Sequence, residues 1–138
     1  DASAVIVLAN YEAVLPEYVD SFVERMALVR GVEKTSLSGF GDFVKGQMET
    51  TPVEHQKVWM GKQTYIALGN ILAVCGELEI DSCPMEGFEA EKYNELLGLK
   101  EKGLTASVVI PIGYRSKEDK AASAAKVRRT PEELFLEV

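Results

Sequence analysis

The residues best suited to chemistry in this sequence form a short turn, Pro84-Met85-Glu86-Gly87, and not a row of reactive side chains. Proline and glycine favour a tight turn, and Gly87 has no side chain to keep a ligand away from the backbone. Such a turn can present main-chain N–H groups to a planar ligand, while Met85 offers a soft apolar surface to an aromatic ring. Because most Pro-Gly turns only connect elements, this segment alone does not identify a site.

A second group of candidates lies in segment 120–129, which carries four cations and no acid in a chain of net charge −7. Lys126 and Arg128 could together hold a phosphate, to which the planar guanidinium is well suited. A ligand with a ring at one end and a phosphate at the other would join this pair to the turn at 84–87. The alternative interpretation is that both cations belong to an ordinary solvated surface.

Catalytic signatures that depend on reactive side chains do not occur in the sequence. It contains no GxSxG, no P-loop, no GxGxxG after a strand and no HExxH. The one histidine, His55, is predicted to be a solvated helix residue and not a general base. One histidine and two cysteines have no zinc-binding spacing, so no metal site is predicted.

Charge, cysteine use and hydropathy restrict the class of protein further. A net charge of −7 argues against a general nucleic-acid binder. Cys75 lies in an apolar helical run and is predicted to be a buried free thiol, which fits a reducing, cytoplasmic location. No apolar run approaches the length of a membrane span.

The elements at the start of the chain follow from its hydrophobic periodicity. Residues 4–9 form a β-branched apolar run, which predicts a strand buried on both faces. A helix is predicted from about Pro16 to Gly31. Segment 33–46 is interrupted by glycines and predicts either a loop or a short, loosely held helix, acting as a mobile lid or as a plain surface connection. The predicted apolar face of the first helix holds Val19, Phe22, Val23, Met26 and Val29.

A long central helix is predicted from Thr51 to about Leu78. Thr51 is expected to be its N-cap, with Glu54 completing a capping box. Residues 65–75 are apolar almost all round, which predicts full burial. The small residues Gly69, Ala73 and Gly76 share one face and would suit either packing within the chain or a subunit interface.

Further elements are predicted in the second half: a helix at 89–97 that ends at Gly98, a buried strand at 105–112 and a terminal strand at 134–138. Three strands are few for so much apolar surface, which predicts missing sequence, a partner subunit, or both. A start at Asp1, without Met and close to the first strand, favours a fragment or processed product.

Four stretches together resemble the nitroreductase family, in its oxygen-insensitive NAD(P)H nitroreductase and dihydropteridine reductase branch. The Pro-x-Glu-Gly-Phe pattern followed by Lys-x-Arg is the specific combination, and the resemblance covers essentially the whole chain. The stretches are Trp59-Met60-Gly61-Lys62-Gln63, Ala67-Leu68-Gly69-Asn70, the run from Ile80 to Phe88, and Lys126-Val127-Arg128.

This resemblance implies an α+β nitroreductase-like fold, with a mixed sheet flanked by helices and a long central helix. Residues 1–138 would form a single domain, the C-terminal segment of that fold without its N-terminal part. The implied function is an FMN-dependent NAD(P)H oxidoreductase that reduces nitroaromatics, quinones or similar acceptors by ping-pong hydride transfer. The implied partner is a second copy in an intertwined homodimer, with no nucleic acid and no membrane.

The resemblance also implies roles for the turn at 84–87. Pro84 and Met85 would line one face of the isoalloxazine ring, and the N–H groups of Glu86 and Gly87 would bond near flavin N5 and O4. No side chain would be catalytic, because the flavin carries the hydride.

Other residues receive roles by the same resemblance. Lys126 and Arg128 would hold the FMN phosphate. Phe40 or Phe43 would correspond to a mobile aromatic residue above the flavin, in contact with substrate. The terminal strand around Phe135 would join the partner's sheet.

The chain also departs from the family pattern. The family's N-terminal part carries an Arg-x-Ser-x-Arg/Lys phosphate motif and an asparagine that touches the flavin ring, and neither occurs in these 138 residues. We therefore expect the chain alone to bind FMN poorly or not at all unless another chain supplies the missing half. Two alternatives stay open: a non-catalytic dimeric interaction module derived from the same fold, and a phosphate-ligand binder without redox chemistry.

Overall fold

The computed structural model of the protein describes residues 2–137, so Asp1 and Val138, the ends of the predicted domain and terminal strand, lie outside the description. Its sheet has three strands in the order β1-β3-β2, and both pairings are antiparallel. The predicted mixed sheet is therefore wrong for residues 2–137, because neither strand that pairs with β3 runs parallel to it. The elements in chain order are β1 (Ala4–Tyr11), α1 (Pro16–Arg30), η1 (Lys34–Leu37), α2 (Ser38–Thr50), α3 (Val53–Glu77), β2 (Asp81–Ser82), α4 (Ala90–Leu97), η2 (Lys100–Lys102), β3 (Leu104–Gly113), η3 (Lys120–Ser123) and α5 (Pro131–Leu134).

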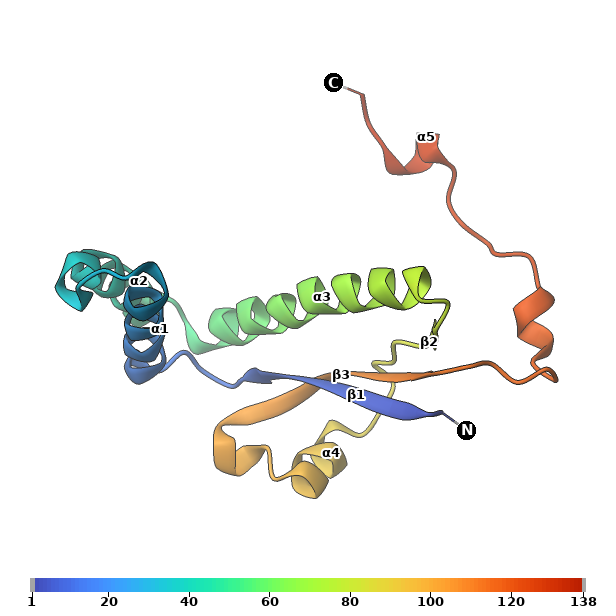
Figure 1. Ribbon diagram of the computed structural model, residues 1–138, viewed down its shortest axis with the longest axis horizontal. Coiled ribbons are helices and arrows are strands. Elements are labelled where there is room, and N and C mark those ends of the chain that lie inside the picture. The colour runs from blue at the N-terminus through green and yellow to red at the C-terminus, as the bar shows by residue number, and fades with distance from the viewer. Residues whose placement is uncertain (1, 138) are drawn as a thin grey trace.

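Figure 1 shows how these elements are layered. Helix α3 runs along one face of the sheet and contacts all three strands, while α4 packs against β3 on the other face. Helices α1 and α2 pack together at one end of the molecule, and β2 lies at the other end of α3. None of the described helices is both long and apolar enough to cross a membrane.

Strand β3 forms the core because it has a neighbour on each edge and a helix over each face. Val108, Val109 and Ile110 are therefore completely buried, at 0% exposure. Strand β1 has only one neighbour, and Val5 remains 51% exposed. The predicted burial of the strand at 105–112 is confirmed for β3. The predicted burial of residues 4–9 on both faces is wrong for β1, because an edge strand receives less cover.

A buried asparagine attaches α4 to the sheet. Asn94, only 1% exposed, accepts a hydrogen bond from the Ala106 main-chain N–H at 2.8 Å and donates one to Thr105 Oγ1 at 3.1 Å. Buried amides of this kind are stable only when they are paired, so these bonds define where α4 sits along β3. The helix ends at Gly98, which adopts the predicted left-handed conformation with φ 59°.

The α1 bounds match the prediction, but its buried face is narrower. Val19 and Val23 are buried as predicted, whereas Phe22 and Val29 are 57% and 72% exposed. The reason is that α1 packs mainly against η1 and α2, which cover only one side of it.

Segment 33–46 is helical, so its interpretation as a loop is wrong. Its Gly41 lets the two helices approach closely, since an added Cβ would lie 3.2 Å from the Val23 side chain.

Helix α3 ends at Glu77, next to the predicted end at Leu78, but its predicted start is wrong. Pro52 occupies the N-cap position, and Thr51 Oγ1 donates to the Gln47 carbonyl at 2.7 Å, so Thr51 closes α2 instead of capping α3. Local competition decides this, because a threonine between two helices can bond to either one.

The prediction that residues 65–75 are buried all round is also wrong for this chain. Only Cys75 is buried in that stretch, while Ile66 and Val74 are 63% and 56% exposed. The three strands cover one side of the helix and leave the other side open. An added Cβ at Gly69 or Gly76 would meet nothing within 4 Å, so packing within the chain does not account for these small residues.

The predicted terminal strand is wrong as well. Residues 131–134 form the short helix α5, and the Glu133 carboxylate accepts a hydrogen bond from the Thr130 N–H at 3.0 Å. Phe135 and Leu136 follow it unpaired, at 70% and 90% exposure. In Figure 1 this C-terminal segment runs away from the sheet, so β3 has no contact with it that could induce strand pairing.

One buried glutamine connects the segment between β1 and α1 to the corner between α2 and α3. Gln56, which is 7% exposed, accepts from the Val14 N–H at 3.2 Å. Its amide group donates to the carbonyls of Met48 at 3.0 Å and Thr51 at 2.9 Å. This side chain therefore links the β1–α1 connection to the α2–α3 corner.

We predict that Gln56→Leu lowers the free energy of unfolding by about 2 kcal/mol, because it leaves buried polar groups without partners. The measurement is urea unfolding followed by circular dichroism. Gln63→Leu is the matched control and should cost less than about 0.5 kcal/mol, because Gln63 is exposed and its one side-chain hydrogen bond in the described part of the chain is to Trp59 of its own helix. Equal losses in the two variants would contradict the role of Gln56.

Candidate functional site

The turn at 84–87 is built as an irregular continuation of the sheet edge. After the two residues of β2, the Cys83 N–H donates to the Pro111 carbonyl at 3.1 Å. Met85 then exchanges two hydrogen bonds with Val109, of 2.8 and 3.1 Å. Alternate residues therefore bond to β3, and the chain leaves the sheet only after Met85.

Beyond Met85 lie the two main-chain N–H groups that the resemblance assigns to a ligand. Within residues 2–137 neither the Glu86 nor the Gly87 N–H donates a hydrogen bond, while the Phe88 N–H closes the turn onto the Glu86 carbonyl at 2.8 Å. The turn is exposed, and an added Cβ at Gly87 would meet nothing within 4 Å. Two adjacent donors beside open space can receive a planar ligand that carries nitrogen and carbonyl acceptors.

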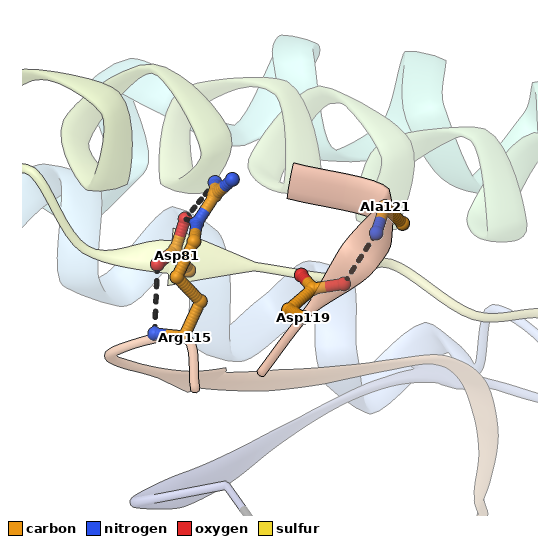
Figure 2. Close-up of polar contacts among 4 residues, drawn as sticks. All are labelled: Asp81, Arg115, Asp119 and Ala121. Carbon is orange, nitrogen blue, oxygen red and sulfur yellow. Dashed lines mark hydrogen bonds and ion pairs between the residues drawn. The ribbon is translucent and has the colours of Figure 1, made fainter. Parts of the chain in front are cut away.

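An ion pair between Asp81 and Arg115, which sequence reasoning missed, fastens the chain after β3 to β2 (Figure 2). The Arg115 N–H donates to Asp81 Oδ2 at 2.9 Å and its Nε to Oδ1 at 2.7 Å, and its Nη2 also bonds Oδ1. Hydrogen bonding by the guanidinium, and then by the Arg115 backbone, lowers the pKa of Asp81 to about 2. The sequence offered little signal for this pair, because no strand was predicted at Asp81, and only the register of Asp81 against Gly113 makes the two residues neighbours.

A cavity of ≈ 780 Å³ lies beside this ion pair, and its lining includes Cys83, Arg115 and Lys126. Lys126 therefore faces the same space as the residue that directly precedes Pro84. The carboxylate of Asp119 accepts from the Ala121 N–H at 2.9 Å, as Figure 2 shows, and so caps the short helix η3. Lys126 makes no ion pair in the described part of the chain, so its charge is available to an anionic group.

Three other predicted residues do not join this cavity. The Arg128 Nη1 donates to the Val127 carbonyl, and Arg128 is not part of the lining. Phe40 and Phe43, 44% and 63% exposed, lie on α2, at the opposite end of α3 from β2 (Figure 1). Helix α3 has 25 residues and is about 38 Å long, which separates the two phenylalanines from the turn. The roles assigned to Arg128, Phe40 and Phe43 therefore stay predictions.

Cys75 and His55 lie as the sequence predicts. Cys75 is a buried free thiol, Cys83 is free and exposed at the cavity, and His55 is exposed in the first turn of α3. Among the residues that the structure describes, no three His, Cys, Asp or Glu side chains gather into a metal-binding group.

The lowered pKa of Asp81 predicts a specific pH dependence. Its carboxyl has a pKa of about 2 in the folded chain against an ordinary value of 3.8. The ion pair therefore stabilises the fold fully at pH values above 3.8, and this stabilisation is lost as the pH falls toward 2. We expect the difference in stability between wild type and Asp81→Asn to shrink over this interval, measured by urea unfolding at a series of pH values.

Arg115→Ala provides the matched control for that series, because it removes the other partner. It should reproduce the pH dependence of Asp81→Asn, and the double variant should add little to either. A carboxyl titration of Asp81 by NMR that shows an ordinary value in the wild type would contradict the ion pair.

Comparison with protein families and sequences gives two results. A family model described as the nitroreductase family matches residues 6–114. The oxygen-insensitive NAD(P)H nitroreductase of Enterobacter cloacae is 42% identical over 81 residues, covering 59% of this chain and 37% of the relative. The protein of the same name from Salmonella typhimurium is 44% identical over 85 residues, covering 62% and 38%. The chain thus spans less than two fifths of the length of these relatives.

Solved structures match over nearly the whole chain. A nitroreductase family protein from Streptococcus pneumoniae superposes with a TM-score of 0.78 at 17% identity, covering 100% of this chain and 65% of that one. A protein from Exiguobacterium sibiricum, described as a nitroreductase and solved in complex with FMN, has a TM-score of 0.77 at 16% identity and covers 99% and 63%. These likenesses confirm the α+β nitroreductase-like fold. With the family match over residues 6–114, they lead to one conclusion: this chain belongs to the nitroreductase family.

Proposed function

We propose that the chain acts as an FMN-dependent NAD(P)H oxidoreductase that reduces nitroaromatics, quinones or similar acceptors. Family membership supports this, as do relatives named NAD(P)H nitroreductase and a related structure solved with FMN. The observation that carries the proposal is the pair of Glu86 and Gly87 N–H groups, which donate no hydrogen bond within residues 2–137 and lie beside open space. The chemistry that bound FMN supplies is hydride transfer from NAD(P)H to the acceptor.

The residues of this chain fit one side of a flavin. Pro84 and Met85 offer apolar surface to the ring, and Met85 is 36% exposed although its backbone is bonded to β3. The N–H groups of Glu86 and Gly87 can donate to ring nitrogen and oxygen acceptors. These contacts bind and orient the ring; none of them requires a side chain to act as acid or base.

The phosphate end of the ligand is assigned to the basic segment. Lys126 lines the cavity next to Cys83 and can balance phosphate charge there. Arg128 would have to exchange its hydrogen bond to the Val127 carbonyl for a phosphate oxygen. That exchange is inexpensive, because the side chain is exposed and the new bond is charge-assisted.

We predict that Gly87→Val weakens FMN binding at least about tenfold, or about 1.4 kcal/mol. The φ of Gly87 is not in the left-handed region, so valine would fill the space of the ligand without straining the backbone. Equilibrium dialysis suits the weak binding expected of this chain, and oxidation of NADH or NADPH with a nitroaromatic acceptor reports activity.

Gly46→Val is the matched control for this test. Gly46 lies on α2, has no neighbour within 4 Å of an added Cβ, and should leave FMN binding unchanged. Equal binding by wild type and Gly87→Val would contradict the assignment of the turn at 84–87 as part of the FMN site. A wild-type protein that binds no FMN and oxidises no NAD(P)H would contradict the proposed function.

We also propose a homodimer in which a second copy covers the outer side of α3. Trp59, Ile66 and Val74 are 46%, 63% and 56% exposed on this helix, an apolar surface that is typical of an interface. Gly69 and Gly76 have open space that would let another backbone approach. Within one chain, α2 lies far from the turn at 84–87. In the proposed dimer, Phe40 and Phe43 on α2 of the second copy would instead approach the flavin bound at that turn.

Ile66→Asp is predicted to raise the dimer dissociation constant at least about tenfold, because it would place a charge in an apolar interface. Sedimentation would separate the 15.2 kDa chain from its dimer. Leu96→Asp is the matched control, since Leu96 is 81% exposed on α4, across the sheet. A wild type that sediments only as a monomer would contradict this partner.

A further inference from the structure

A side-chain hydrogen bond connects the turn at 84–87 to the long helix. The hydroxyl of Tyr65, on α3, donates to Glu86 Oε1 across 21 positions of sequence. The resemblance assigns Glu86 a role through its main-chain N–H. Its carboxylate therefore has a separate contact, directed to another element of the fold.

The backbone of the turn has few other attachments. Its last bonds to β3 are those of Met85, and after them only the Phe88 N–H holds the turn, through the Glu86 carbonyl. All four residues from Pro84 to Gly87 are exposed. Within residues 2–137, the Tyr65–Glu86 contact is the one side-chain hydrogen bond that fixes this turn to another element.

We infer that Tyr65 is a positioning residue, which acts through the Glu86 carboxylate to hold the turn so that the Glu86 and Gly87 N–H groups stay directed at the ligand. A hydrogen bond to a carboxylate is stronger than one between neutral groups, so a single contact can restrain an exposed turn. Restraint before binding reduces the entropy that the ligand must offset. The identity of the ligand as FMN rests on the proposed function.

The same bond has a second consequence. A free carboxylate on Glu86 could fold back and accept the neighbouring N–H groups, in competition with a ligand. Bonding to Tyr65 directs it away from them. The carboxylate also raises the pKa of the Tyr65 phenol, chiefly by accepting its hydrogen bond, which provides a spectroscopic signature of the contact.

The test that needs no ligand is amide exchange followed by NMR in Tyr65→Phe. Losing the contact should speed exchange of the Phe88 amide about three- to tenfold, while the Cys83 amide, bonded to Pro111, keeps its rate. Tyr11→Phe is the control, since Tyr11 stacks on Tyr18 and its hydroxyl makes no hydrogen bond in the described structure. An unchanged Phe88 rate in Tyr65→Phe would overturn the inference.

Glu86→Gln tests the partner without removing the main-chain N–H. The pKa of the Tyr65 phenol should return toward its ordinary value, as read from its NMR signal, and Phe88 exchange should accelerate as in Tyr65→Phe. The double variant should exchange no faster than either single variant. Additive effects would show that the two side chains act separately and would overturn the inference.

FMN binding separates this inference from the proposed function. If wild type binds FMN, Tyr65→Phe should weaken binding by a factor similar to its effect on Phe88 exchange, and unchanged affinity would overturn the positioning role. If wild type binds no FMN, the proposed function fails, while the Phe88 rate still decides whether Tyr65 holds the turn.

Discussion

The pairing of β3 on both of its edges is the constraint on which this structure depends. One edge holds β1, and the other holds β2, Cys83 and Met85 in succession. Because α3 and α4 cover its two faces, the strand is completely buried at its centre and cannot move without disturbing every layer. The turn at 84–87 thus begins beside the most deeply buried strand of the fold, although the turn itself is exposed. That combination is favourable for a backbone-type site, since exposure admits a ligand and hydrogen bonds to the buried strand orient the donors.

Around this strand the chain leaves much apolar surface without cover. The three strands shield one side of α3, and the tail after β3 contacts little of the fold. The burial predicted for residues 65–75 was wrong for the single chain, yet the pattern that led to it is real, because the residues on the open side of the helix remain apolar. The proposed second copy would cover this surface. It would also supply Phe40 and Phe43, which lie far from the turn within one chain.

Predictions from the sequence succeeded where the signal was local and had no competitor. Gly31 and Gly98 end their helices in the left-handed conformation, and the β-branched run near Ile110 is a strand. They failed where two partners competed or where the environment decided. Thr51 bonds to the helix before it, and the apolar residues near Phe135 have no strand beside them to pair with. In the candidate site, the turn at 84–87 was found from residue types alone, while its hydrogen bond to Tyr65 and the neighbouring ion pair between Asp81 and Arg115 were not.

The sequence by itself therefore determined the main strands and helices, the family resemblance and the turn whose backbone donors carry the proposal. These depend on residues within a few positions of each other, where propensity and spacing act directly. Only the tertiary structure decided the strand order, the burial of each face, the Asp81–Arg115 pair and the contact between Tyr65 and Glu86. Those contacts join residues 21 to 34 positions apart, and no local pattern specifies which of many possible polar partners the folded chain brings within hydrogen-bonding distance.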